Sequence, residues 1–456
     1  MYDGLPSGWI RAKIRDIALV NPRHTTNIDP GTEISFVPMA GLNTVDYKFN
    51  FTEIKKISDV RKNYSHFAEG DVLFAKITPC MENGKAAIAN GLKNGLGCGS
   101  TELHVLRAKR GVNKRLLYYY LHQESFRRDA QRNMTGTSGH LRVPAEYIKS
   151  AEIPLAPESE QKRIVTKLEK LMAKVDQCKA RLEKFPSILK RFRQSVLAAA
   201  CSRELTKYWR EEHQIVKWQE TTLGTESEYV TSGSRGWAKY YSDNGAMFIR
   251  AQNINTDKLV LGDVAFVKLP KKIEGTRTKI NQCDILVTIT GANVTKTALV
   301  DEEVGEAYVN QHVALVRLKN KKHSRYIYLY LIAPNAGRKQ LEDAAYGAGK
   351  PGLNLQNIKD VQIELPSLKE QKEIVRQVEV LFKIADQIEE RYNKAKDYVD
   401  KLKQSILAKA FRGELVPQDP NDEPASKLLE RIKAMKENPK PESNNRKRSS
   451  NKKARN

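Results

Sequence analysis

Every motif in this chain that resembles a catalytic or nucleotide-binding site lacks a residue on which the chemistry depends. Around Gly347-Ala348-Gly349-Lys350, positions 344 and 351 hold alanine and proline, where a Walker-type phosphate loop needs glycine and Ser or Thr. Asn21-Pro22-Arg23-His24 lacks the second proline and the aromatic residue of an amino-methyltransferase tetrapeptide. The glycine-rich patch at 95–99 has no strand–helix context, so we interpret it as a turn. Neither ATP binding nor methyl transfer is expected of this chain.

Nucleophiles, acids and metal ligands are equally scattered. Glu53-Ile54-Lys55 stands alone as a nuclease-like motif, and no Ser–His–Asp or Cys–His set can be assembled. The five cysteines form no CxxC pair, and the eight histidines form no HxxxH or HExxH pair. We therefore predict reduced thiols in a cytoplasm, no metal site and no catalytic residue.

The composition indicates a binding protein with a polyanionic partner. Lys and Arg number 78 against 54 Asp and Glu, which gives a net charge of +24 and favours nucleic acid. A ribosomal or other RNA-associated protein would share this composition and stays an alternative here. At about 150 residues per domain, 456 residues suggest about three units. No apolar run is long enough for a membrane span, and Met1–Ile14 has no signal-peptide pattern.

An internal repeat organises the chain. Residues 153–205 align without a gap on residues 363–415, and 20 of these 53 positions are identical. Upstream, a more divergent block keeps nearly the same offset, so that Trp9 corresponds to Trp218. The order is therefore variable block, helical block, variable block, helical block and tail. Because the halves keep the helical blocks and change the others, we interpret the repeat as functional rather than as a silent duplication.

Both repeated segments have the apolar spacing of a coiled-coil helix. Ile164 and Leu168 begin the stripe in the first copy, and Ile374 and Val378 begin it in the second. About 40 residues make a helix of roughly 60 Å. We expect the two helices to pair antiparallel, although ordinary core packing would also explain the stripes. Pro186 occurs only in the first copy and predicts a kink or break there.

The variable blocks are predicted to be α/β. Strands are expected over 70–77, 101–106, 284–290 and 312–318, and helices over 113–132 and 324–345. A Gly- and Thr-rich loop follows in each block, at 135–140 and 346–352, matching in position but not in sequence. Beyond the second helical block we predict a short amphipathic helix, Ala425–Lys436. A disordered basic tail is expected over 440–456, either touching DNA phosphates or merely solvated.

Three motifs together resemble the specificity subunits of type I restriction–modification systems. Leu5-Pro6-Ser7-Gly8-Trp9 is similar to that family's LPxGW start. Both helical blocks open with its Glu-Gln-x-x-Ile-Val signature, at 160–165 and 370–375, and 405–415 resembles its SILxxAFxGxL exit. The first copy departs from that exit, since Cys201 and Arg203 replace the Phe and Gly. The resemblance covers nearly the whole chain except its last ~20 residues.

The resemblance implies an α+β (α/β) architecture with an internal pseudo-twofold repeat. Two target recognition domains would be separated by two long antiparallel coiled-coil helices. The expected division is 1–155 for target recognition domain 1, 156–210 for the central helical spacer, 211–365 for target recognition domain 2, 366–420 for the second helical spacer, and 421–456 for the short helix and basic tail.

The resemblance also implies a non-catalytic, cytoplasmic subunit that reads a bipartite asymmetric site on double-stranded DNA. Its partners would be two modification (methyltransferase) subunits, which use S-adenosylmethionine to methylate adenine N6. Restriction (translocase and nuclease) subunits would add ATP- and Mg²⁺-dependent cleavage. No cofactor is expected on this chain itself. The alternative is a stand-alone DNA-binding or scaffold protein with no enzyme partners.

On this interpretation, polar side chains in the loops read base edges while Lys and Arg neutralise phosphates. The candidate DNA contacts in the first block are Lys76, Thr78, Thr135, Thr137, Ser138, His140 and Arg142. Those in the second block are Thr288, Thr290, Asn293, Lys296, Tyr346, Lys350 and Asn354. The alternative for each is an ordinary loop residue. Glu160-Gln161 and Glu370-Gln371 are expected to serve helix starts or partner docking instead.

Overall fold

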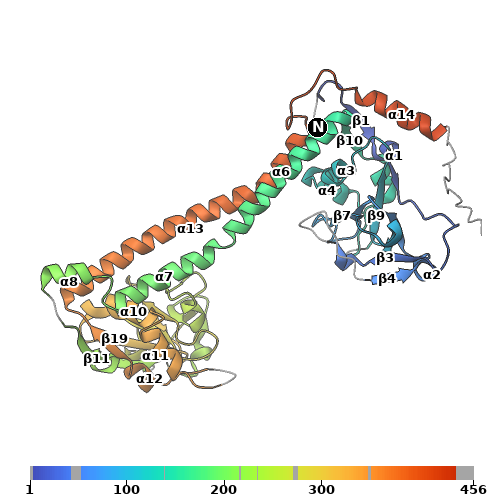
Figure 1. Cartoon of the computed structure of the whole chain (residues 1–456). Coiled ribbons are helices and arrows are strands. Elements are labelled where there is room, and N and C mark those ends of the chain that lie inside the picture. Colours follow the sequence, from blue (N-terminus) through green and yellow to red (C-terminus); the bar gives the residue numbers. More distant parts are fainter. Residues whose placement is uncertain are drawn as a thin grey trace, which may run out of the picture. The chain divides into compact units, whose positions relative to one another are not determined.

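The computed structural model describes residues 4–42, 53–137, 139–214, 217–233, 235–270, 276–347 and 351–437. The chain forms two compact units (Figure 1). Unit 1 comprises the residues up to 180 together with those from 396 onward, and unit 2 comprises residues 181–395. Each unit has its own main hydrophobic core.

Unit 1 contains two four-stranded sheets and a two-stranded ribbon. The first sheet has the antiparallel order β2 (Ala18–Val20), β9 (Leu103–Ala108), β6 (Val72–Ala75) and β7 (Ala86–Ile88). The second has the order β4 (Glu53–Lys56), β3 (Glu33–Val37), β8 (Leu96–Gly99) and β5 (Ser65–Ala68), with β3 and β8 parallel. The ribbon pairs β1 (Ile10–Lys13) with β10 (Glu152–Leu155). All four residues of β6 are buried, which explains why its sequence is a continuous apolar run.

Unit 2 repeats this plan. Its first sheet has the antiparallel order β12 (Ser227–Ser232), β19 (Val313–Leu318), β16 (Ile285–Thr288) and β17 (Thr297–Leu299). Its second has the order β13 (Tyr241–Ser242), β15 (Ala265–Val267), β14 (Ala246–Ile249) and β18 (Ala307–Val309), with β14 and β18 parallel. The ribbon pairs β11 (Gln219–Thr222) with β20 (Gln362–Leu365). The second sheets differ between units, because β5 joins β8 whereas β13 joins β15.

The expected helices at 113–132 and 324–345 are each two helices, which corrects the sequence-based boundaries. Unit 1 has α3 (Lys114–Leu121) and α4 (Glu124–Arg132), because Gln123 adopts an extended conformation between them. Unit 2 has α10 (Ser324–Ile332) and α11 (Gly337–Ala344). Pro334 lies between these two and has no N–H with which to continue α10. The remaining short helices are α1 (Ile14–Ile17), α2 (Ile57–Val60), α5 (Ala145–Ser150), α8 (Lys207–His213), α9 (Leu223–Glu226) and α12 (Leu355–Lys359).

The first helical block is divided and the second is continuous. The first consists of α6 (Glu158–Leu182) and α7 (Phe185–Cys201), with Pro186 in the first turn of α7, so the expected break at this proline is confirmed. The second is α13 (Leu368–Phe411), a single helix of 44 residues (Figure 1).

The helical blocks pair antiparallel within each unit. In unit 1, Lys179 contacts Asp400 at 3.0 Å and Asp176 contacts Lys403 at 2.5 Å, so rising numbers on α6 meet falling numbers on α13. In unit 2, Arg193 of α7 contacts both Asp386 and Glu389 of α13. The apolar stripe of α13 is not buried along its whole length, since Ile384 and Ile388 are 44% and 37% exposed.

The C-terminal helix is present as expected. Helix α14 (Ala425–Glu437) packs on unit 1 through the buried Leu428 and Ile432, and Ala425 N–H donates to the Gly8 carbonyl at 2.8 Å. The predicted basic tail at 440–456 lies outside the described residues. Within the described ranges, none of the helices has the length and apolar character that crossing a lipid bilayer requires.

Candidate nucleic-acid interface

Three segments of unit 1 that are distant in sequence are joined by main-chain hydrogen bonds just beyond strand β6. The Lys76 N–H donates to the Glu102 carbonyl at 2.9 Å, and the Val143 N–H donates to the Lys76 carbonyl at 2.9 Å. The Thr78 N–H donates to the Leu141 carbonyl at 3.0 Å. We call residues 76–78, 102, 134–137 and 139–143 loop cluster 1. The fold thus brings every candidate of the first block that the structure describes into one place.

A short hairpin forms the exposed part of loop cluster 1. Thr135 and Arg142 exchange two main-chain hydrogen bonds of 2.9 Å. The tip between them carries Thr137 and His140, and Thr135, Thr137 and His140 are all exposed. Ser138, the remaining candidate on this loop, lies outside the described residues. Exposed hydroxyl and imidazole groups on a short loop can reach base edges in a groove.

Loop cluster 1 contains an ion pair between Arg142 and Glu102, with the cation Lys76 next to it. Arg142 donates to Glu102 through Nε at 2.8 Å and through Nη2 at 2.9 Å. These hydrogen bonds hold the pKa of Glu102 below its usual value. Lys76 is half-buried next to this pair, and its charge further lowers the Glu102 pKa. The Thr78 hydroxyl donates to Glu82 at 3.1 Å.

Unit 2 builds the same main-chain framework with different residues. The Ile289 N–H donates to the His312 carbonyl at 2.9 Å, and the Leu353 N–H donates to the Ile289 carbonyl at 2.8 Å. Tyr346 and Gly352 exchange two hydrogen bonds of 3.1 and 2.9 Å. We call residues 288–296, 312, 346–347 and 351–354 loop cluster 2. Positions 76, 102 and 142 of unit 1 thus correspond to 289, 312 and 352 of unit 2.

The candidates of the second block differ in exposure. Tyr346 is 62% exposed, and Thr290 is half-buried with its Oγ 2.5 Å from His312 Nδ1. The prediction that Thr288 is a DNA contact is wrong, because Thr288 lies in strand β16 with its side chain completely buried. Lys350 lies outside the described residues.

The three remaining candidates of loop cluster 2 have protein partners. Asn354 caps helix α12 by accepting from the Asn357 N–H at 2.8 Å. Lys296 lies 3.4 Å from Asp257, and Asn293 donates to the Ala251 carbonyl at 3.3 Å. Lys296 and Asn293 are half-buried, whereas Asn354 is exposed.

A buried aspartate anchors the strand that leads into each cluster. Asp71 accepts two hydrogen bonds of 2.8 Å from Arg107, and Asp284 accepts bonds of 2.9 and 2.6 Å from Arg317. Each aspartate also accepts a main-chain N–H from the turn before the strand, from Ala68 or Asn281 respectively. Asp71 and Asp284 are each 1% exposed. The hydrogen bonds to these aspartates raise the pKa of Arg107 and of Arg317. Loops on such a fixed strand start from a defined position.

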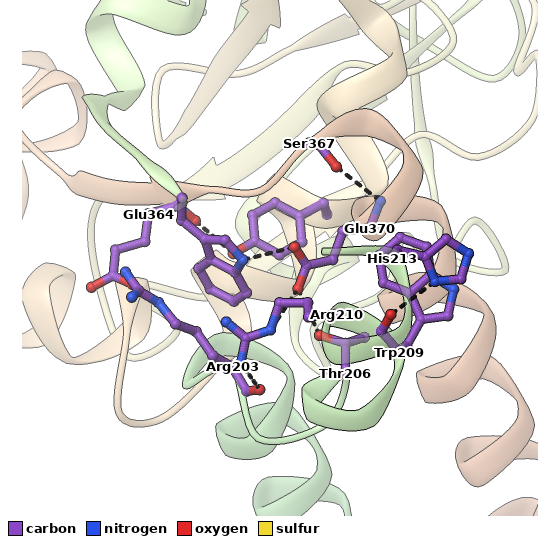
Figure 2. A network of polar contacts seen from close by, with 10 residues as sticks. Arg203, Thr206, Trp209, Arg210, His213, Glu364, Ser367 and Glu370 are labelled. Atoms are coloured by element: carbon purple, nitrogen blue, oxygen red, sulfur yellow. Dashed lines mark hydrogen bonds and ion pairs between the residues drawn. The ribbon is translucent and has the colours of Figure 1, made fainter. Parts of the chain in front are cut away.

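The Glu-Gln signature at the helix starts is buried and structural. Glu370 accepts from Trp218 Nε1 at 2.9 Å and from Thr206 Oγ1 at 2.7 Å, with Arg210 Nε 3.4 Å away (Figure 2). In unit 1, Glu160 likewise accepts from Trp9 Nε1 at 2.9 Å. Gln161 and Gln371 each donate to a carbonyl just before their own helix, at 2.9 and 2.7 Å. This confirms the expected role of both pairs at helix starts.

One cluster of potential metal ligands escaped the spacing rules, because its members come from three distant segments. His24, His66 and Cys98 place their ligand atoms within 4.8 Å of one another. His66 Nδ1 already accepts the His24 N–H at 3.1 Å, and His66 Nε2 lies 2.8 Å from the Arg61 carbonyl. Burial raises the pKa of the Cys98 thiol to about 12, which disfavours the thiolate that binds a metal. The group fits a hydrogen-bonded core cluster better than a metal site.

Comparison with known proteins places the chain in a family. The model of the type I restriction modification DNA specificity domain matches twice, at residues 6–184 and 217–396. The chain is 30% identical to the type I restriction enzyme StySPI specificity subunit of Salmonella potsdam, with 94% of this chain and 96% of that protein covered. It is 28% identical to the EcoKI specificity subunit of Escherichia coli strain K12, with the same coverage.

The fold has close counterparts among solved structures. The HsdS subunit from Thermoanaerobacter tengcongensis superimposes with a TM-score of 0.65 at 20% identity, covering 90% of this chain and 98% of that one. A chain from a study of complex assembly and conformational transition in the type I R-M system gives 0.68 at 20% identity, covering 91% and 100%. The protein therefore belongs to the family of type I restriction–modification specificity subunits, and it carries two DNA specificity domains.

Proposed function

We propose that this chain reads the two halves of a bipartite, asymmetric site on double-stranded DNA, with loop cluster 1 reading one half and loop cluster 2 the other. The chain itself performs no chemistry. It directs two methyltransferase subunits to an adenine N6 in each half, and with restriction subunits it directs cleavage from the same site. The complex works in the cytoplasm, where the five cysteines, all unpaired, stay reduced.

The observation that carries this proposal is the pair of matching frameworks with unlike side chains. The same main-chain bonds close both clusters, yet Lys76, Glu102 and Arg142 are replaced by Ile289, His312 and Gly352. A repeat that conserves the scaffold and changes the exposed groups is what two readers of different sequences require. Polar side chains on such loops discriminate base edges, while affinity comes mainly from Lys and Arg on phosphates.

The chemistry of modification and cleavage is assigned to the partners. S-adenosylmethionine would be bound by the methyltransferase subunits, and ATP and Mg²⁺ by the restriction subunits. The motifs that would hold these groups on this chain lack essential residues, as at Ala344 and Pro351. No step of either reaction is therefore assigned to a residue of this chain.

The helical blocks are proposed to set the length of DNA between the two half-sites. Helix α13 is continuous across the boundary between the two units at 395/396. B-DNA advances about 34–36 Å per helical turn, so a rigid helix translates into a fixed number of base pairs. On this basis we propose residues 156–210 and 366–420 as spacer regions, 1–155 and 211–365 as recognition domains, and 421–456 as an appended tail.

The decisive experiment is methylation mapping by single-molecule sequencing. Cells would express this chain together with its neighbouring methyltransferase gene, or the methyltransferase gene alone. A split, two-part adenine motif that appears only when this chain is present supports the proposal. A motif that persists without the chain, or the absence of any motif, contradicts it and favours a scaffold without enzyme partners.

A chimera tests the assignment of the two readers. Residues 2–155 would be replaced by the corresponding block of another family member. The expected result is a new sequence in one half-site and an unchanged sequence in the other. A change in both halves contradicts the two-reader model.

A further inference from the structure

The guanidinium of Arg142 is held in a fixed plane at the base of the hairpin in loop cluster 1. Its Nε and Nη2 donate to the two carboxylate oxygens of Glu102 at 2.8 and 2.9 Å, and its Nη1 donates to the His140 carbonyl at 3.0 Å. Parallel bonds to both oxygens fix the orientation of a guanidinium as well as its position. The side chain of Arg142 is nevertheless 43% exposed.

The hydrogen bonds of Arg142 leave a defined set of donors for a ligand. A guanidinium has five N–H groups, and the three bonds use one on each nitrogen. One N–H therefore remains on Nη1 and one on Nη2. Two donors on neighbouring nitrogens match the O6 and N7 acceptors of guanine in the major groove, which is the commonest specific contact of arginine with DNA.

The main chain of Glu102 is fixed by hydrogen bonds, so its carboxylate stays in position to bind Arg142. Its carbonyl accepts from the Lys76 N–H at 2.9 Å, and its own N–H donates to Ser100 Oγ at 3.2 Å. Its side chain is 24% exposed, less than that of Arg142. The main chain of Glu102 is thus fixed on both sides of its side chain, and Arg142 is the more exposed partner of the pair.

The ion pair is not required to close the hairpin. In unit 2, Gly352 stands at the position of Arg142 and His312 at that of Glu102, yet Tyr346 and Gly352 close the same turn through main-chain bonds. A role in folding alone would therefore leave the two charged side chains unexplained. A role in recognition explains why they occur in one cluster and not in the other.

We propose that Arg142 reads one guanine in the half-site bound by unit 1, and that Glu102 is a positioning residue that orients Arg142 for this contact. This inference rests on the proposed function and deepens it by assigning a base to a side chain. The second half-site has no such reader at the corresponding position, since Gly352 has no side chain there.

The test is the methylation motif of variants, mapped in cells that also express the methyltransferase gene. Arg142→Ala should relax one position of one half-site from guanine to any base, with discrimination falling about 5- to 150-fold, as expected for loss of a bidentate contact. Glu102→Gln should relax the same position partially, because the amide keeps one acceptor for Arg142 and presents a donor to its second N–H. Neither variant should alter the other half-site.

Arg376→Ala provides a matched control. Arg376 makes a similar bidentate pair, with Glu373 at 2.8 and 2.7 Å, but it lies on α13 and belongs to neither loop cluster. Its loss should leave the motif unchanged. A change in the motif of this variant as large as that of Arg142→Ala would overturn the inference, because loss of any such pair would then suffice.

Several results separate the inference from the proposed function. If the wild-type chain directs no bipartite motif, the proposed function fails and the inference fails with it. If the wild type directs a motif that Arg142→Ala leaves intact, or relaxes at a base other than guanine, only the inference is overturned. If Arg142→Ala relaxes a guanine and Glu102→Gln has no effect, the positioning role of Glu102 is wrong.

A second measurement does not depend on the folding of any variant. The wild-type chain, in complex with its methyltransferase, would be titrated with duplexes in which one guanine at a time is replaced by 7-deazaguanine. Loss of the N7 acceptor should weaken binding several-fold at one guanine of one half-site. Uniform binding across all such duplexes would overturn the assignment of guanine to Arg142.

Discussion

Trp218 donates its indole N–H to the carboxylate of Glu370 at 2.9 Å, and Glu370 is completely buried. The bond joins the residue before the first strand of unit 2 to the first turn of its long helix. Trp9 and Glu160 make the same bond, of the same length, in unit 1. The chain just before the first ribbon strand of each unit is thus joined to the first turn of a long helix by a buried hydrogen bond.

Replacing Trp218 with Phe should therefore weaken unit 2 selectively. The buried carboxylate loses one of its donors, and an unmet hydrogen bond of this kind costs about 1–3 kcal/mol. Amide hydrogen exchange measured by mass spectrometry should become faster around residues 218–232 and 368–378 and should stay unchanged in unit 1. Trp9→Phe is the matched control and should show the reverse pattern. Equal effects of both variants on both units would contradict this assignment.

Removing Arg317 should be more damaging than removing Arg107. Asp284 and Asp71 are equally buried, but the Arg317 side chain is 13% exposed whereas that of Arg107 is 35% exposed. A buried carboxylate left without its cation costs about 3–5 kcal/mol. Water reaches the Arg107 site more readily and should reduce the cost there. Denaturant unfolding of Arg317→Ala and Arg107→Ala, followed by amide hydrogen exchange in each unit, measures the loss of stability in each variant. A larger loss in Arg107→Ala than in Arg317→Ala would contradict this prediction.

The stability of unit 1 should fall as the pH drops from about 6.5 toward 4. Burial lowers the pKa of His104 to about 4, and the ring lies between Asn21 and the Val143 carbonyl. Between these pH values the unfolded chain binds a proton that the folded chain does not, so protonation favours unfolding. The contribution of His104 is roughly 3 kcal/mol above pH 6.5, and it is lost as the pH falls through the folded pKa.

His104→Ala tests this, because Ala314 stands at the corresponding position of unit 2. The variant should be less stable at pH 7, and the dependence of its unfolding free energy on pH should be flatter. Part of the slope should remain, since burial also lowers the pKa of His122 to about 4. A slope identical to that of the wild type would show that His104 titrates normally in the folded chain.

Lengthening α13 should alter the spacing of the recognised site. One heptad inserted after Ala395 adds about 10 Å of helix at the point where the sequence passes from unit 2 to unit 1. Methylation mapping should reveal a longer tolerated spacer or a complete loss of methylation. The same seven residues inserted between Asp419 and Pro420, beyond the helix, should leave the motif unchanged. An unchanged spacer with the α13 insertion would contradict the proposed role of the helices.

Much of the fold was predictable because the sequence repeats. The helical blocks, the break at Pro186, the buried strands β6 and β16 and the helix at 425–437 all follow from spacing and composition. The ribbons β1–β10 and β11–β20 were not foreseen, because their paired residues lie 139 to 146 positions apart in the sequence. The divisions between α3 and α4 and between α10 and α11 were missed because the apolar spacing continues past Gln123 and Pro334 without a visible interruption.

The surface exposure of the candidate DNA contacts was predictable for some residues and not for others. Loop residues Thr135, Thr137, His140 and Tyr346 are exposed, as their turn-like surroundings indicate. Thr288 was misplaced because its polar side chain suggested a surface position, although Thr288 is the last residue of β16 and all four residues of that strand are buried. Glu102 was overlooked, since its partner Arg142 is 40 residues away and the two segments meet only through their main-chain hydrogen bonds with Lys76.

The main-chain closure of both loop clusters has a consequence for how new specificities arise. Because carbonyl and N–H groups hold the turns, side chains at positions such as 76, 142 and 346 are released from the task of folding and can vary at little cost in stability. A library randomised at these positions should consequently contain many folded members with altered motifs. The same tolerance would let natural variants drift from one target to another without passing through an unfolded protein.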